Sequence, residues 1–76
     1  MKKFEKGQIV TLKELVGMRL FVERRHAFPD QVHEVKPLGN NRFEYVYNEM
    51  QRLVYDGDKP FRVVSQNDCF LYLYDE

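Results

Sequence analysis

The sequence predicts a mostly-β domain, in the form of a small antiparallel barrel or a bent sheet of five or six short strands with one short helix. Three observations lead to this prediction. Short stretches of alternating apolar and polar residues recur along the chain, separated by glycine, asparagine, aspartate or proline. Hydrophobic residues make up 43% of the chain, too many for a disordered segment. The length of 76 residues leaves room for one core, so residues 1–76 are expected to form a single domain.

The first third of the chain favours two strands joined by one helical turn. Residues 8–12 are largely apolar and indicate a strand. Thr11 and Glu14 have the spacing of a capping box, which indicates a single turn of helix. The extended pattern resumes over residues 18–23, whereas residues 24–30 have no clear period and are expected to form a loop.

A hairpin is expected in the middle of the chain. Residues 31–38 and 42–47 flank Gly39-Asn40-Asn41, and both glycine and asparagine tolerate the positive φ angles of a tight turn. The second of these strands carries an aromatic residue at every other position, which forms a stripe: Phe43, Tyr45 and Tyr47.

The one short helix is predicted from about Glu49 to Tyr55. Asn48 and Gln51 have the spacing of a capping box. Apolar residues then recur at i, i+3 and i+4, as on one face of a helix: Met50, Leu53 and Val54. Asp56-Gly57-Asp58 is expected to end this helix, with its glycine in the left-handed conformation of a C-cap.

Two more strands are expected over residues 61–65 and 69–74. Because side chains on a strand point to alternate faces, the last strand has two distinct sides. One side is expected to enter the core, with its cysteine acting as a small hydrophobe: Cys69, Leu71 and Leu73. The other side is an aromatic ladder: Phe70, Tyr72 and Tyr74. If this strand forms a sheet edge, it could pair with the same strand of a second chain.

Two segments resemble known proteins. Residues 4–12 look like the first strand of SH3-like small barrels, in which a Lys-Gly turn leads into an alternating valine strand. Residues 47–63 are similar in layout to small uncharacterised proteins of bacteriophage and prophage genomes. The first resemblance implies an SH3-like barrel, and the second implies a phage-type modulator of a host protein. Neither resemblance assigns a functional residue.

The charge balance limits the class of partner. The chain has 12 basic and 12 acidic side chains, which argues against a protein whose main task is to hold a nucleic-acid backbone. Residues 1–25 nevertheless hold seven basic and three acidic side chains, a balance of +4. This end is either ordinary solvated surface or a basic patch for an acidic or phosphate partner, formed by Arg19, Arg24 and Arg25.

No residue pattern predicts catalysis, a metal or a cofactor. His26 and His33 are separated by a proline and lack further ligands at the spacing of a zinc site. Cys69 has no adjacent base to stabilise a thiolate, and the four glycines are too dispersed for a phosphate loop. We therefore expect a non-enzymatic protein with no metal and no cofactor.

The sequence also predicts a cytoplasmic protein. One cysteine excludes an internal disulfide, so no oxidising compartment is needed. The first residues lack the apolar core of a signal peptide. The apolar runs are far shorter than the roughly 20 residues of a membrane span, so no membrane partner is expected.

The two aromatic stripes are the candidate binding residues, with one stripe expected in the core and the other against a partner. Our main hypothesis is protein–protein interaction, with another protein or a second copy, because tyrosine and arginine are frequent at interface centres. The alternative is single-stranded nucleic-acid binding, in which bases stack on aromatic rings beside arginines. The candidate residues are Phe70, Tyr72, Tyr74, Tyr45, Tyr47, Arg19, Arg24 and Arg25.

Overall fold

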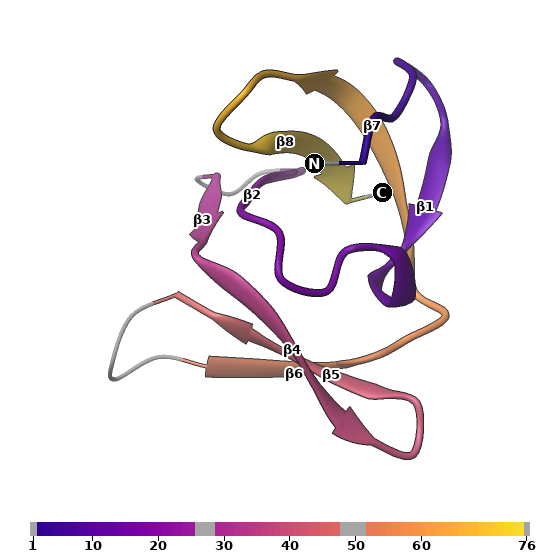
Figure 1. Cartoon of the computed structure of the whole chain (residues 1–76), viewed down its shortest axis with the longest axis vertical. Helices are drawn as coiled ribbons and strands as arrows, with labels where there is room; N and C mark the ends of the chain where they lie inside the picture. The colour runs from indigo at the N-terminus through magenta and orange to yellow at the C-terminus, as the bar shows by residue number, and fades with distance from the viewer. Residues whose placement is uncertain (1, 26–28, 48–51, 76) are drawn as a thin grey trace.

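Strands dominate the computed structural model of the chain, which describes residues 2–25, 29–47 and 52–75 (Figure 1). The elements follow in the order β1 (Ile9–Thr11), a 3₁₀ turn η1 (Leu12–Glu14), β2 (Leu20–Arg24), β3 (Asp30–Val32), β4 (Glu34–Gly39), β5 (Arg42–Val46), β6 (Arg52–Asp56), β7 (Pro60–Gln66) and β8 (Leu71–Asp75). The mostly-β prediction is confirmed, with more strands than expected. Among the described residues, no helix is long and apolar enough to cross a membrane.

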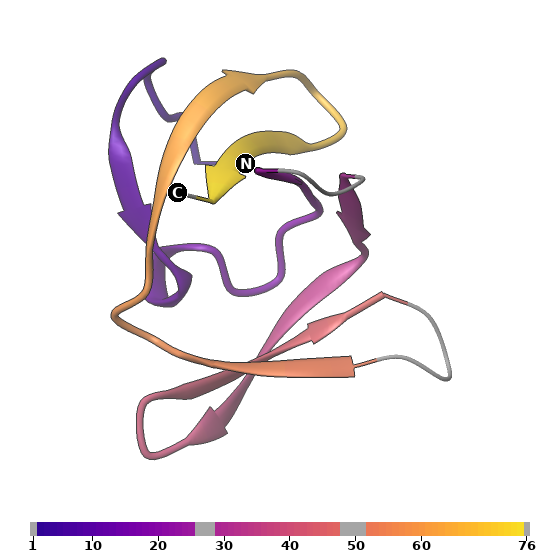
Figure 2. The ribbon, with the colours of Figure 1, turned by 180° about the vertical axis from the view of Figure 1, so that it is seen from behind.

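The strands form two sheets. The larger has the order β1-β7-β8-β2-β3, and the smaller has the order β4-β5-β6. Figures 1 and 2 show the small sheet lying beside the large one, with β3 leading into β4 and β6 leading into β7. A bend at His33 separates β3 from β4, so one extended stretch supplies a strand to each sheet. The described residues therefore form a bent two-sheet structure, and the predicted SH3-like closed barrel is not confirmed.

The large sheet is not purely antiparallel. β2 and β8 run parallel, with Leu20 opposite Leu71 and Val22 opposite Leu73. On its other side β8 pairs antiparallel with β7. The last strand is therefore internal, and the expectation that it could offer a free edge to a second chain is wrong. This pairing joins segments far apart in the sequence, which local residue patterns do not reveal.

The prediction of a short helix is wrong for residues 52–55, the part of the segment that the structure describes. Arg52–Asp56 is strand β6, which pairs antiparallel with β5. Residues 48–51, with the expected capping box, lie outside the described residues. Two adjacent apolar residues, Leu53 and Val54, suit a short strand as well as a short helix, so the pairing with β5 decides between them.

Both predicted turns near the start and middle of the chain are confirmed. The Thr11 backbone N–H donates to Glu14 Oε2 at 2.9 Å, next to the single 3₁₀ turn. In the hairpin between β4 and β5, Gly39, Asn40 and Asn41 have φ angles of 87°, 54° and 59°. These residues take the left-handed conformation that the turn requires.

The core lies between the two sheets and the turn that joins β1 to β2. Cys69 does not belong to it: its side chain is exposed, and the backbone N–H groups of Cys69 and Phe70 donate to Asn67 Oδ1 at 2.7 and 2.9 Å. This turn delays the start of β8 until Leu71, which corrects the prediction of a core cysteine. The buried apolar side chains are Phe4, Val10, Leu12, Leu15, Leu20, Val22, Val32, Val35, Phe43, Tyr45, Phe61, Val63, Leu71 and Leu73.

Candidate binding face

Aromatic side chains gather on the outer side of the large sheet. Phe21 on β2 lies opposite Tyr72 on β8, and their rings stack with centroids 5.3 Å apart. The ring of Phe70, just before β8, lies 5.9 Å from that of Phe21. Tyr74 is the next outward residue of β8, and all four side chains are half-buried. We call Phe21, Phe70, Tyr72 and Tyr74 the aromatic face.

Strand alternation places these rings on the outside. Leu20 and Val22 of β2 are fully buried, as are Leu71 and Leu73 of β8. The residues between them must therefore point away from the core. The aromatic ladder expected on the last strand faces outward, and Phe21 joins it from the neighbouring strand. Sequence reasoning missed Phe21, although it alternates with the two buried residues of β2.

Polar groups of both signs surround the rings. The Tyr72 hydroxyl donates to Glu23 Oε2 at 3.1 Å, and this hydrogen bond raises the pKa of Tyr72. Arg62 on β7 is exposed and lies opposite Tyr74 in the sheet. The aromatic face thus has an apolar centre and a mixed polar rim, as protein interfaces do.

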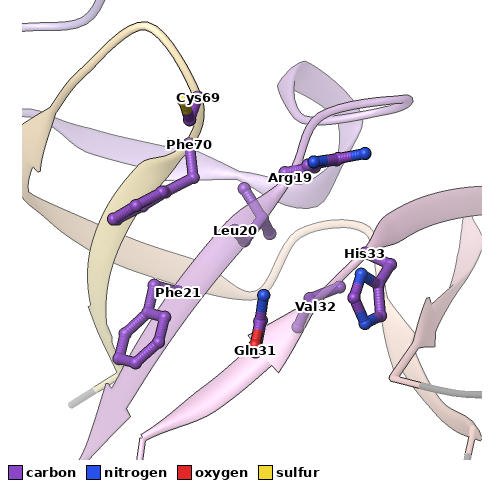
Figure 3. A pocket seen from close by; sticks show the side chains of 8 residues that line it. All are labelled: Arg19, Leu20, Phe21, Gln31, Val32, His33, Cys69 and Phe70. Atoms are coloured by element: carbon purple, nitrogen blue, oxygen red, sulfur yellow. The ribbon is translucent and has the colours of Figure 1, made fainter.

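A cavity of about 250 Å³ adjoins the aromatic face at Phe21 and Phe70 (Figure 3). Figure 3 shows Gln31 and His33 on the β3 side of this cavity, across from Phe70. A lining of apolar surface with a few polar groups suits an apolar side chain that carries a polar end. The lining residues are Arg19, Leu20, Phe21, Gln31, Val32, His33, Cys69 and Phe70.

Arg24 lies elsewhere, in a cluster that joins the two sheets. Its Nη2 atom lies 2.9 Å from Asp30 Oδ2 and donates to the hydroxyls of Tyr55 at 2.6 Å and Tyr47 at 3.2 Å. Its Nε atom lies 3.8 Å from Asp75 Oδ2. Because Arg24 belongs to β2 and Tyr55 to β6, the cluster ties the large sheet to the small one. We call these five residues the Arg24 cluster.

Burial and neighbouring charges shift the pKa of Arg24 in opposite directions. Burial lowers the pKa of Arg24, but the tyrosine oxygens and the Asp30 carboxylate outweigh it and raise that pKa above its ordinary value. Burial also raises the pKa of Tyr45 and Tyr47. The Tyr45 hydroxyl is buried without a hydrogen-bond partner among the described residues. Tyr45 and Tyr47 therefore contribute to packing between the sheets and not to the aromatic face.

Replacing Tyr45 with phenylalanine is expected to raise the free energy of unfolding by about 1 kcal/mol, because it removes a buried hydroxyl that has no partner. Urea unfolding at neutral pH measures this. Tyr74→Phe, at a half-buried position of β8, is the matched control and is expected to change stability little. A clear loss of stability in Tyr45→Phe would contradict this expectation.

The same substitution tests a pH dependence. Burial raises the pKa of Tyr45 and Tyr47 above the value of about 10 that tyrosine has in an unfolded chain. The stability that depends on these hydroxyls staying protonated is therefore complete below about pH 10 and is lost as the pH rises through the higher folded-state pKa. We expect the parent to lose stability in this range, and Tyr45→Phe to lose less. Equal losses would contradict the assignment to Tyr45.

The three candidate arginines do not form one patch. Arg19 and Arg25 flank β2 at its two ends, and both are exposed. Arg24 is engaged in its cluster. The structure therefore brings Arg19 together with Phe70, beside the cavity, and leaves Arg25 at the far end of the strand.

Groups for catalysis or metal binding do not gather in the part of the chain that the structure describes. No three His, Cys, Asp or Glu side chains lie close enough there to hold a metal ion. His26, one of the two histidines considered for a metal, lies outside the described residues. His33 and the exposed Cys69 both line the cavity.

Comparison with protein-family models, curated proteins and solved structures gives no match to this chain. The resemblances to SH3-like modules and to phage proteins therefore stay predictions.

Proposed function

We propose that this chain is a non-enzymatic binding module that takes a protein partner on its aromatic face. The observation that supports this most directly is the row of three neighbouring rings, Phe21, Phe70 and Tyr72, which stay half-exposed beside a cavity. Aromatic residues are enriched at interfaces, where a few central residues carry most of the binding energy.

The cavity and the rim add detail to this proposal. An apolar side chain of the partner would enter the cavity and pack against Phe21 and Phe70, while polar groups of the partner meet Arg19 and Gln31. Burying the rings would remove apolar surface from water. Each Å² of that surface would contribute about 25 cal/mol to the free energy of binding. The polar rim would then set the orientation of the partner.

The charges favour a protein over single-stranded nucleic acid. Glu23 lies at the rim and accepts a hydrogen bond from Tyr72, so its carboxylate would repel a phosphate passing over that ring. The observation that favours the nucleic-acid alternative is the position of Arg19 and Arg62 on either side of the rings. That alternative is tested alongside the main proposal.

Replacing Phe21 and Tyr72 together with serine is expected to weaken partner binding at least tenfold, since truncating central interface aromatics costs about 2 kcal/mol or more. The partner is captured from the native cell with the parent chain, purified and titrated. Leu38→Ser is the matched control, because Leu38 is 51% exposed and lies on the other sheet. Circular dichroism confirms that both variants fold.

Two results would contradict the proposal. Equal affinity of the parent and the double variant would show that the aromatic face is not the interface. Binding of a fluorescent poly-pyrimidine oligonucleotide that weakens steeply with salt and is lost in the double variant would replace the protein partner with single-stranded nucleic acid.

A further inference from the structure

Among the described strands, β6 is the least protected sheet edge. The described strands leave four edges, β1, β3, β4 and β6. β1 and β3 have three residues each, and β4 contains Pro37 and a register shift. β6 has five residues with neither a proline nor a register shift. Because short strands, prolines and bulges keep edges from pairing, β6 is the edge best able to accept another strand.

One hydrogen bond shows which backbone groups of β6 face outward. The Gly57 N–H donates to the Asn41 carbonyl at 2.7 Å. In an antiparallel ladder this bond makes the adjacent pair, Arg42 and Asp56, a non-hydrogen-bonded pair. The backbone N–H of Asp56 therefore points away from β5.

The alternation of the ladder orients the rest of the strand. Leu53 and Tyr55 exchange hydrogen bonds with β5, whereas the N–H and C=O groups of Arg52 and Val54 point to the free edge. The residues Leu53 and Val54 are 42% and 47% exposed. The edge thus offers both unpaired backbone groups and apolar side chains.

The geometry points to antiparallel pairing of β6 with β6 of a second copy of this chain, with Val54 on the two-fold axis. In this register Val54 of one copy faces Val54 of the other. The outward N–H of each Val54 donates to the outward C=O of the Val54 in the second copy. Arg52, whose Nη1 lies 3.7 Å from Glu44 Oε1 of its own chain, also faces Asp56 of the second copy, so opposite charges meet on both sides of the axis. Leu53 faces Tyr55 of the second copy. The strand is therefore complementary to itself, which is what a two-fold interface requires.

The pairing would merge the two small sheets into one continuous sheet. The Asp56 carbonyl is already engaged, because it accepts a hydrogen bond from the Lys59 N–H at 3.2 Å in the turn after β6. The outermost hydrogen bond between the two copies therefore runs from the Asp56 N–H to the Arg52 carbonyl of the second copy. A single strand pair buries little surface, so the dimer is weak and depends on concentration. The aromatic face lies on the other sheet, so the two proposals can fail separately.

Val54→Lys is the decisive variant, because it places two ammonium groups opposite each other on the two-fold axis. We expect it to raise the dimer dissociation constant at least tenfold in sedimentation velocity over a concentration series. Leu38→Lys is the matched control, since Leu38 is exposed on β4 of the same sheet, and it is expected to dimerise like the parent.

Amide exchange of the parent chain provides a second readout that needs no variant. Exchange of the Val54 amide is expected to slow as the protein concentration rises. A parent that stays monomeric up to its solubility limit, with a fast-exchanging Val54 amide throughout, would overturn the proposal. A Val54→Lys variant that is folded and dimerises as tightly as the parent would also overturn it.

Discussion

Replacing Arg24 with methionine is expected to lower the free energy of unfolding by about 3 kcal/mol. This value is at the low end of the range for breaking a buried ion pair, because 29% of the Arg24 side chain is exposed. The substitution leaves the Asp30 carboxylate and two tyrosine hydroxyls without the group that binds them. A domain of this size has a small stability margin, so the loss would leave a large fraction of the chain unfolded on warming.

Urea unfolding of two variants tests this expectation. Arg25→Met is the matched control: Arg25 is the next residue, it is exposed, and its loss should change stability by less than about 0.5 kcal/mol. Arg24→Lys should recover part of the stability, because one ammonium keeps the charge but lacks the planar fork that reaches several partners. Similar unfolding midpoints for Arg24→Met and Arg25→Met would contradict the role given to the cluster.

Replacing Gly57 with alanine is expected to cost about 2–3 kcal/mol by crowding. A Cβ atom at this position would lie 2.5 Å from Phe43 Cε2 and would also meet the Asn41 side chain. Neither neighbour moves easily. Phe43 is part of the core, and Asn41 Nδ2 donates to two carboxylates of the adjoining turn at 3.0 Å.

Gly39→Ala is the matched control for this prediction. Gly39 has a φ angle of 87° with open space around it, so alanine there suffers backbone strain of only about 1–2 kcal/mol. Adding Asn41→Gly to Gly57→Ala should restore part of the stability, because the second substitution removes the Asn41 side chain, one of the two crowding groups. Glycine also suits position 41, where φ is 59°. Gly57→Ala that is at least as stable as the parent in urea unfolding would contradict the crowding.

Several structural features follow from neighbouring residues and were predictable for that reason. The hairpin at Gly39-Asn40-Asn41 depends on backbone preferences of the turn residues themselves. The capping box at Thr11 and Glu14 joins two residues three apart. The outward direction of Tyr72 follows from simple alternation with its buried neighbours in β8.

Other features depend on contacts between distant segments. Arg52–Asp56 has too few apolar residues to distinguish a helix from a strand, and its pairing with β5 makes it a strand. The same pairing, continued to Gly57, explains why this glycine is needed for space beside Phe43 and not for a left-handed helix cap.

The local pattern of residues thus establishes a mostly-β chain, its middle hairpin and the two-sided character of its last strand, since each depends on interactions within a few residues. The partners of each strand come from the folded chain. Parallel pairing of β2 with β8 adds Phe21 to the aromatic face and makes β8 internal. Packing of the two sheets draws Tyr45 and Arg24 inward. Alternation shows that two faces exist, but the burial of apolar area across distant segments determines which face becomes core.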